Sequence, residues 1–407
     1  MSSFRIYLKP FDELGAYVSD WVDITQDVIS TKLGNLARQI DANTFDVGVF
    51  KFNNFSLSVR NDHGLFGVAD SLRSIFNFKR SDTQVRITWS LNFDGPFCGT
   101  AICNIATLGE EIDIFQGLLN DLSAQTDTRN QQLTFQVLGL ESIFTKVKAP
   151  FSAFSDGILF SQVLFACLNQ SAITELLGVS VSNINLDNDL AIDDVSSLEN
   201  KTVKEVLDTI LLLSNSVLTI KNQTVIISSR APSSIVVKEF FGQASNIGIE
   251  NIISITQIRT GINKTFNFWT WRDTTLLRSD TLSTQQFGVF KKEIDSELLT
   301  FDSQRLTVLE ALRDEFSFPK QELTLNTPLD YDFFNINFLD KVRIDYPVIA
   351  TPSDANDLPI YGSSVYGASV YPDAVFTLVI DPSDEFKILG ITINLRSSSY
   401  SLQLRRV

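Results

Sequence analysis

The chain has 407 residues, of which 44% are hydrophobic and 20% are charged, and this composition excludes an intrinsically disordered protein. Its length exceeds what one hydrophobic core usually serves, so we expect about two to four domains. The net charge of −15 argues against a surface that binds nucleic acid through clustered lysine and arginine, although DNA could pass along an acidic wall without sticking to it. The same charge disfavours binding to an anionic membrane surface.

Alternating polar and apolar residues predict short strands through the first 150 residues. This pattern is typical of a β-barrel or a β-sandwich. Turn chemistry separates the strands, as at Asn61-Asp62-His63-Gly64. The strand candidates are residues 1–7, 55–60, 85–91, 97–105 and 133–137.

The N-terminal segment lacks the basic start and the apolar stretch of a signal peptide. No apolar run approaches the roughly 20 residues that span a bilayer. We therefore expect a protein that is made in the cytoplasm and has no stable membrane insertion. The three cysteines, Cys98, Cys103 and Cys167, cannot all pair internally, so we expect buried thiols in a reducing compartment.

The apolar period changes to that of helices between residues 151 and 235. One helical face comprises Phe160, Val163, Leu164, Cys167 and Leu168. A second helix is predicted to begin after Thr202, because Thr202 and Glu205 form a possible capping box and apolar residues follow at helical spacing. Two short strands, residues 217–220 and 224–227, then flank a turn. These features predict a smaller α+β part within a mainly β chain.

The last third is again rich in strand patterns. The candidates are strands at residues 251–259, 265–271 and 375–380 and a short helix at residues 308–316. Residues 351–372 differ in kind, because Tyr361, Tyr366 and Tyr371 recur every five residues and each precedes a glycine or a proline. We interpret this segment as a surface loop that could contact a neighbouring chain.

The chain ends in a predicted β-hairpin. Ile391, Ile393 and Leu395 alternate with polar residues, a turn follows at residues 397–399, and then Tyr400, Leu402 and Leu404 alternate with polar residues. This pattern indicates two antiparallel strands, each with one apolar and one polar face. The assignment places Arg396 and Arg405 on the polar face.

No residue pattern in the sequence indicates catalytic chemistry. The single histidine, His63, lies in a turn, where a structural role is favoured over that of a general base. One histidine and three cysteines lack the paired spacing of a zinc site. The acidic segment with Asp187, Asp189, Asp193 and Asp194 fails the EF-hand pattern and is interpreted as a solvated loop. We therefore predict no catalytic, metal-binding or cofactor-binding residue and no enzyme activity.

The order of these elements resembles the baseplate hub, or tail-tip hub, proteins of tailed bacteriophages. Three features carry the resemblance: the strand-rich start, the module in which residues 198–207 lead through a helix into two strands, and the ending at residues 386–391 with the hairpin to Val407. The resemblance covers the organisation of most of the chain.

The resemblance implies two tail-tube-like β-barrel domains, at residues 1–150 and 236–407, and an accessory α+β domain at residues 151–235, and it leaves open whether these domains are interleaved in sequence. It implies a homotrimer that forms a pseudo-sixfold ring in the virion tail. The implied partners are the distal tail, tail tube and tape measure proteins and the tip, spike or fibre proteins, with DNA as passing cargo at ejection. Abundant phenylalanine suits permanent subunit contacts.

Two other functions remain open at this point. A distal tail or receptor-binding protein would bind carbohydrate, and Trp269, Trp271 or the segment Tyr361–Tyr371 would then be exposed. A tail-associated cell-wall hydrolase is the second alternative.

Overall fold

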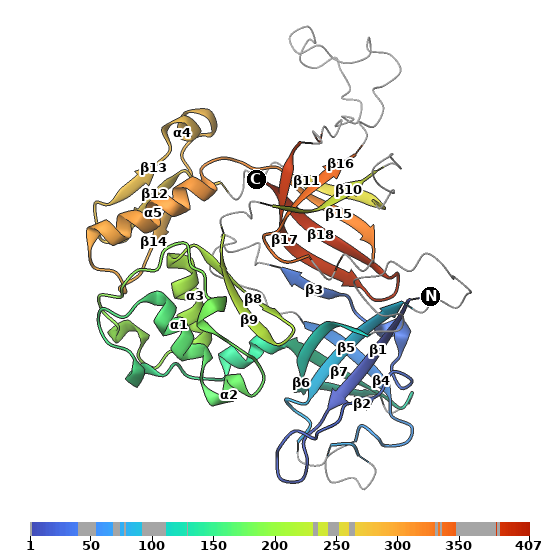
Figure 1. Cartoon of the computed structure of the whole chain (residues 1–407). Helices are drawn as coiled ribbons and strands as arrows, with labels where there is room; N and C mark the ends of the chain where they lie inside the picture. Colours follow the sequence, from blue (N-terminus) through green and yellow to red (C-terminus); the bar gives the residue numbers. More distant parts are fainter. Residues whose placement is uncertain are drawn as a thin grey trace, which may run out of the picture.

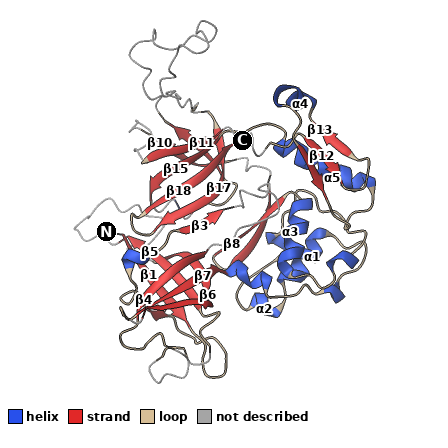
Figure 2. Ribbon diagram, turned by 180° about the vertical axis from the view of Figure 1, so that it is seen from behind, coloured by secondary structure: helices blue, strands red, loops and turns tan. Residues whose placement is uncertain are grey.

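The protein folds into two β-sheets with a helical region beside them (Figure 1). The computed structural model describes residues 2–39, 54–67, 74–76, 79–91, 111–127, 129–230, 235–242, 252–259, 265–329, 333, 336–346, 380 and 383–407. The two sheets lie one above the other, and the helices lie together on one side of them in both views (Figures 1 and 2). The mainly β fold class predicted from the sequence, with a smaller α+β part, is confirmed, and the two predicted barrels are curled, half-barrel sheets.

The first sheet is entirely antiparallel and has the strand order β2-β1-β5-β6-β7-β4. Its strands are β1 (Ser2–Lys9), β2 (Val22–Asp23), β4 (Asn54–Arg60), β5 (Gln84–Leu91), β6 (Ile112–Asp127) and β7 (Gln132–Gly139). Leu57 of β4 pairs with Phe135 of β7, and both side chains are buried. The strands predicted at residues 1–7, 55–60, 85–91 and 133–137 are therefore confirmed. Residues 97–105 lie outside the described residues.

The second sheet takes strands from both ends of the chain. Its order is β10-β16-β17-β18-β15-β11, and β3 also pairs with β17. The strands are β3 (Leu36–Gln39), β10 (Val236–Phe241), β11 (Ser254–Arg259), β15 (Glu322–Pro328), β16 (Lys341–Asp345), β17 (Glu385–Asn394) and β18 (Ser399–Arg406). Because Arg38 of β3 pairs with Ile391 of β17, a segment from the first forty residues completes the C-terminal sheet.

The C-terminal hairpin forms as predicted, with one correction. Ile391 pairs with Leu402 and Ile393 pairs with Tyr400, and all four side chains are buried. Arg405, which the alternation assigned to the polar face, is fully buried, so that assignment is wrong for this residue. Its guanidinium lies 5.5 Å from the ring of Phe316, the last residue of a helix whose end meets this part of the sheet. Sequence alternation carries no information on such a contact.

The first part of the helical region comprises α1 (Phe160–Leu168), α2 (Ser171–Thr174), α3 (Val203–Leu213) and the hairpin of β8 (Ser216–Lys221) and β9 (Thr224–Ser229). The predicted capping box starts α3: Thr202 Oγ1 accepts from the Glu205 backbone N at 3.3 Å, and Glu205 Oε2 accepts from the Thr202 backbone N at 2.7 Å. Both predicted helices bury the predicted apolar faces. Short 3₁₀ turns span Ser30–Lys32, Leu140–Thr145, Phe151–Ala153, Val181–Asn183 and Ser196–Leu198.

The second part of the helical region is a three-stranded sheet with two helices. Its elements are β12 (Phe268–Trp271), β13 (Leu277–Ser279), α4 (Thr281–Phe287), β14 (Lys291–Ile294) and α5 (Asp302–Phe316). The helix predicted at residues 308–316 is confirmed, and it begins six residues earlier, at Asp302. Of the described helices, none is both long and apolar enough to cross a membrane.

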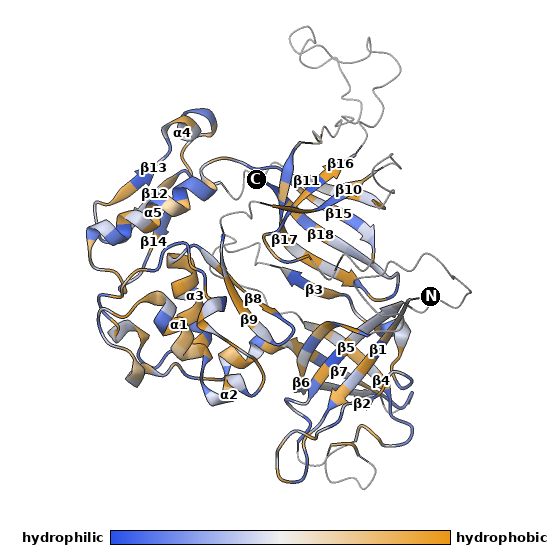
Figure 3. Ribbon diagram, viewed as in Figure 1, coloured by the Kyte–Doolittle hydropathy of each residue, from blue (hydrophilic) through white to orange (hydrophobic). Residues whose placement is uncertain are grey.

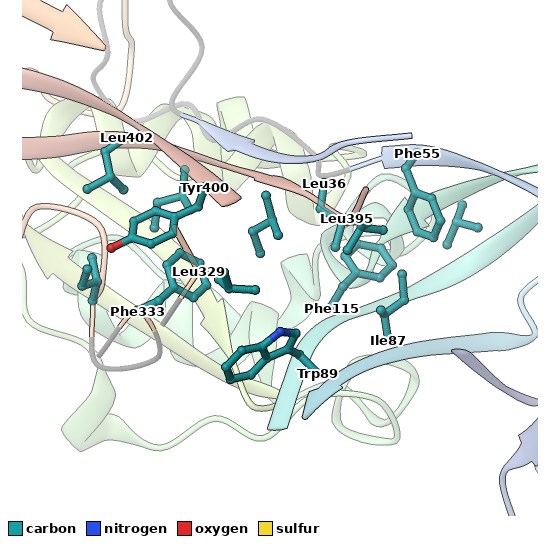
Figure 4. Close-up of a cluster of buried hydrophobic side chains, with 14 of the residues drawn as sticks. Leu36, Phe55, Ile87, Trp89, Phe115, Leu329, Phe333, Leu395, Tyr400 and Leu402 are labelled. Carbon is teal, nitrogen blue, oxygen red and sulfur yellow. The ribbon is translucent and has the colours of Figure 1, made fainter. Parts of the chain in front are cut away.

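Buried apolar side chains form two large cores. One core is shared by both sheets, and Figure 4 shows where side chains from the two sheets meet, with Phe115 of β6 beside Leu395 at the end of β17. In the same core, the rings of Phe333 and Tyr400 lie 4.5 Å apart. The other core fills the helical region and includes Leu118 of β6. Helices α1 and α3 are correspondingly rich in hydrophobic residues (Figure 3).

Candidate assembly site

One short segment bridges both edges of the first sheet. Residues 22–23 pair with β1, and the Ile24 backbone N donates to Ile6 O at 2.9 Å. At the other edge, the Ile29 backbone N donates to Ser58 O at 2.8 Å and the Arg60 backbone N donates to Asp27 O at 2.8 Å. Because backbone groups at sheet edges are templates for pairing with other chains, this segment blocks such pairing along part of each edge, at residues 6–8 of β1 and 58–60 of β4.

The second sheet carries exposed apolar side chains on its outermost described strands. Ile235, which precedes β10, is 69% exposed and Val237 on β10 is 44% exposed, while Ile253, which precedes β11, is 61% exposed. Among the described residues of the first sheet's strands, no large apolar side chain is exposed. Exposed apolar residues on outer strands mark places where another protein surface can pack. Because β10 and β11 are the two ends of the strand order, these three residues mark both edges of the second sheet, and together they are called the candidate assembly site.

An ion pair lies where the two sheets and the helical region meet. Arg38 Nη2 is 3.9 Å from Glu141 Oε1, donates to Ile220 O at 2.7 Å, and its guanidinium lies 5.4 Å from the Phe338 ring. Burial raises the pKa of the Glu141 carboxyl and lowers the pKa of Arg38, and the attraction within the pair opposes both shifts. The pair lines a cavity of about 180 Å³ whose other walls are mostly apolar, such as Ile391. This arrangement joins the three parts of the molecule and presents no nucleophile beside a general base.

Neither His63 nor Cys167 lies in a site that suggests catalysis. The His63 side chain is 83% exposed in its turn and lies 3.7 Å from the Asp62 carboxylate. Cys167 is buried in the helical core, and burial raises the pKa of its thiol to about 12, which keeps it protonated and unreactive. Cys98 and Cys103 lie outside the described residues.

The acidic segment ahead of α3 is a loop, as predicted, and its carboxylates are hydrogen-bond acceptors. Asp189 accepts from the backbone N and Oγ of Ser161, at 2.9 and 2.6 Å, at the start of α1. Asp193 accepts from the Thr300 backbone N at 2.6 Å, which ties the two parts of the helical region together. Within the described part of the chain, no group of three or more His, Cys, Asp or Glu side chains could hold a metal ion.

Both tryptophans considered for carbohydrate binding are buried. Trp269 is fully buried and Trp271 is 2% exposed, in the core of the helical region. The exposure that the receptor-binding alternative requires is therefore absent at these two residues. The segment Tyr361–Tyr371 lies outside the described residues.

Sequence reasoning missed the residues of the candidate assembly site and of the ion pair. The run Ile235-Val236-Val237 directly follows the Pro-Ser-Ser break at residues 232–234, and three consecutive β-branched residues are a signal for a strand without a polar face. Arg38 and Glu141 gave no such signal, because residues so far apart in sequence meet only through the pairing of β3 with β17.

Comparisons with known proteins show similarity in structure only. No family model matches the sequence, and no curated protein matches it. The tail protein from Neisseria meningitidis MC58 aligns with a TM-score of 0.54 and 10% identity, over 99% of this chain and 96% of that protein. The prophage tail protein gp18 from Listeria monocytogenes EGD-e aligns with a TM-score of 0.51 and 8% identity, over 98% of this chain and 94% of that protein.

A third solved structure, the 43 kDa tail protein of prophage MuSo2 from Shewanella oneidensis, gives a TM-score of 0.50 and 11% identity, over 100% of this chain and 98% of that protein. All three alignments run over nearly the whole of both chains. The resemblance to phage tail proteins predicted from the sequence is therefore confirmed for the fold.

Proposed function

We propose that this chain is a structural protein of a phage tail or a phage-derived tail-like particle, and that it forms a trimeric baseplate or tail-tip hub. The observation that carries the proposal is the pair of curled sheets with one shared core, in a fold shared with phage tail proteins along nearly the whole chain. Three copies, each with two half-barrel sheets, would supply six sheets around one axis. Such a ring can continue a sixfold tail tube.

The exposed apolar side chains support assembly through the second sheet. Ile235, Val237 and Ile253 lie on or beside its outermost described strands, whereas both edges of the first sheet are bridged within the chain. We propose that these residues contact a neighbouring copy. In the assembled ring, burial of this surface would contribute to subunit affinity.

The net charge supports a channel through which DNA passes. A charge of −15 is compatible with an axial channel lined by more acids than bases, which would repel a polyanion and let it move without binding. We propose that such a hub lies in the virion tail and contacts the tail tube, distal tail, tape measure and tip proteins. The functional units would be the two sheets, with β3 from the N-terminal part of the chain completing the second sheet. The domain limits near residues 150 and 235 stay a prediction.

Light scattering and electron micrographs of the purified chain test the proposal. We expect a particle of three times the chain mass of 45.5 kDa and a ring with an open centre. A monomer at micromolar concentration, with no ring in the micrographs, would contradict a trimeric hub. A glycan array and peptidoglycan zymography test the receptor-binding and hydrolase alternatives, and a positive result in either would replace the proposed role.

A further inference from the structure

Helix α5 ends with a carboxylate that three cations surround. Glu315 Oε1 contacts Lys387 Nζ directly and lies 3.9 Å from Arg230 Nη2, and Glu315 Oε2 lies 3.9 Å from Lys320 Nζ. Arg230 is fully buried, Lys387 is 1% exposed and the Glu315 side chain is 11% exposed. One carboxylate therefore forms ion pairs with three cations in a site with little access to water.

A second carboxylate and an aromatic ring complete this charge cluster. Arg405 Nε lies 3.8 Å from Glu322 Oε1. The guanidinium groups of Arg230 and Arg405 each lie 5.5 Å from the ring of Phe316, within the range of cation–π attraction. The charge cluster thus comprises Arg230, Lys320, Lys387, Arg405, Glu315 and Glu322, four cations and two carboxylates.

The charge cluster joins parts of the molecule that have separate cores. Arg230 directly follows β9 in the helical region, and Glu315 and Phe316 end α5, while Lys387 and Arg405 belong to β17 and β18 of the second sheet. Among the described residues, the buried apolar side chains that form a separate cluster between these parts are only three: Val217, Leu339 and Leu389. This apolar cluster is small, and the other described contacts between the two parts include the charge cluster and the hydrogen bond from Arg38 to Ile220 O.

The environment lowers the pKa of both Glu315 and Lys387, which favours the charged form of Glu315 and disfavours the charged form of Lys387. Burial disfavours the Glu315 carboxylate, but Lys387, Arg230 and Lys320 together outweigh burial and hold its pKa at about 2. Burial and the neighbouring cations Arg230 and Lys320 lower the pKa of Lys387 to about 7, against the attraction of Glu315. The stability that Glu315 contributes is complete above its ordinary pKa of 4.5 and is lost as the pH falls toward 2. For Lys387, whose folded pKa lies below its ordinary 10.5, stability rises with pH from about 7 to 10.5.

We propose that Glu315 is an electrostatic latch between the helical region and the second sheet, so that neutralising this one carboxylate releases the helical region while both sheets stay folded. Loss of Glu315 leaves four cations around one carboxylate, whereas loss of Lys387 leaves Glu315 with two cations. Loss of Glu315 is therefore expected to weaken the contact between the helical region and the second sheet more than loss of Lys387 does. This inference is independent of the proposed role in a phage tail.

Limited trypsin digestion of the full chain tests the latch, because Lys320 lies in the connection between α5 and β15 and its side chain is only 24% exposed. In Glu315→Gln we expect cleavage after Lys320 to become about tenfold faster, as local opening exposes the connection, with no new cleavage in β1–β7. Glu310→Gln is the matched control, since Glu310 lies on the same helix and accepts from the Arg278 Nε at 2.7 Å on the surface. This control should be cut at the native rate.

The double variant Glu315→Gln/Lys387→Met keeps the net charge of the cluster while it removes the central contact. We expect cleavage after Lys320 between the native rate and that of Glu315→Gln, and the double variant serves alone if Glu315→Gln yields no folded protein. A native cleavage rate in the folded variants would overturn the latch. Cleavage that increases equally across both sheets would also overturn it, because Glu315 would then support the whole fold.

Discussion

The two sheets of this chain share one hydrophobic core, but they differ in what lies at their edges. In the first sheet, residues 22–29 pair with β1 at one edge and hydrogen-bond to β4 at the other. In the second sheet, the outermost described strands carry Ile235, Val237 and Ile253 as exposed side chains. A sheet whose edges are bridged within its own chain is complete as a monomer, whereas apolar residues exposed on outer strands favour contact with another molecule. Under the proposed assembly, this difference predicts that the second sheet, rather than the first, contacts a neighbouring copy.

Substitutions in the shared core are expected to lower the free energy of unfolding the most. Leu57 of the first sheet and Leu402 of the second are both fully buried in that core. Leu57→Ala and Leu402→Ala should each lower the free energy of unfolding by about 2–5 kcal/mol, because each leaves a cavity. Leu14→Ala is the control, since Leu14 is 92% exposed, and should change it by less than about 0.5 kcal/mol. Denaturant titration would contradict a common core if the two variants shifted separate unfolding transitions.

The strand that links the sheets predicts the next largest effect. Arg38→Met removes the cation beside the buried Glu141 carboxylate, as well as the hydrogen bond to Ile220 O. We expect a loss of roughly 3 kcal/mol in the free energy of unfolding, because a buried charge loses its partner. Arg60→Met, at an exposed position on β4, is the matched control. An equal effect of the two substitutions would show that the ion pair does not stabilise the junction.

Glu141 also makes this junction sensitive to pH. Its pKa in the folded protein is raised by burial above the ordinary value of 4.5. The folded state therefore binds more protons than the unfolded state above about pH 4.5, and stability falls as the pH rises through the folded pKa. We expect wild type to lose stability relative to Glu141→Gln between pH 4.5 and neutral pH, as measured by urea unfolding. A difference that stays constant with pH would contradict the raised pKa.

The contrast between the edges is tested by placing one charge on each sheet. Val237→Lys should weaken self-association at least about tenfold, because lysine on an outer strand opposes packing against another chain. Ser56→Lys places the same charge at an exposed position on β4 and should leave self-association unchanged. Light scattering over a concentration series measures both. If Ser56→Lys prevented assembly and Val237→Lys did not, the two sheets would have the opposite roles.

Local patterns predicted the elements that depend on nearby residues. The capping box at Thr202 and Glu205, the buried face of α1 and the C-terminal hairpin were all predicted, because each is encoded within about ten residues. Strand β6 was not predicted, since its sequence from Ile112 to Asp127 lacks a regular alternation, and its pairing with β7 shifts register between Asn120 and Gln125. A register shift removes the period on which such a prediction depends.

Features that depend on contacts between distant segments could not be predicted. The pairing of β3 with β17 joins residues more than 350 positions apart, and nothing near Arg38 indicates it. Arg405 was assigned to a polar face for the same reason, because the end of α5 that covers it lies far away in sequence. The candidate assembly site was missed since exposure is a property of the folded chain. Its apolar run at Ile235 could have indicated only a strand.

The smallest predicted effect tests how the helical region is coupled to each sheet. Thr202→Ala removes the cap of α3 and should cost about 1 kcal/mol. Thr209→Ala on the same helix is the control and should be nearly neutral, because Thr209 Oγ1 only donates to the Glu205 carbonyl within the helix.

Hydrogen exchange can show where the effect of Thr202→Ala spreads. Leu118 of β6 belongs to the helical core. The second sheet meets the helical region through the hydrogen bond from Arg38 of β3 to Ile220 O, through the small cluster of Val217, Leu339 and Leu389, and through the Glu315 latch. Loosening of α3 should therefore speed exchange in β6 more than in β18. Faster exchange in β18 than in β6 would mean that the second sheet is coupled more tightly to the helical region than the first sheet is. The two sheets would then differ in the exposed residues of their outer strands and not in a weaker contact of the second sheet with the helices.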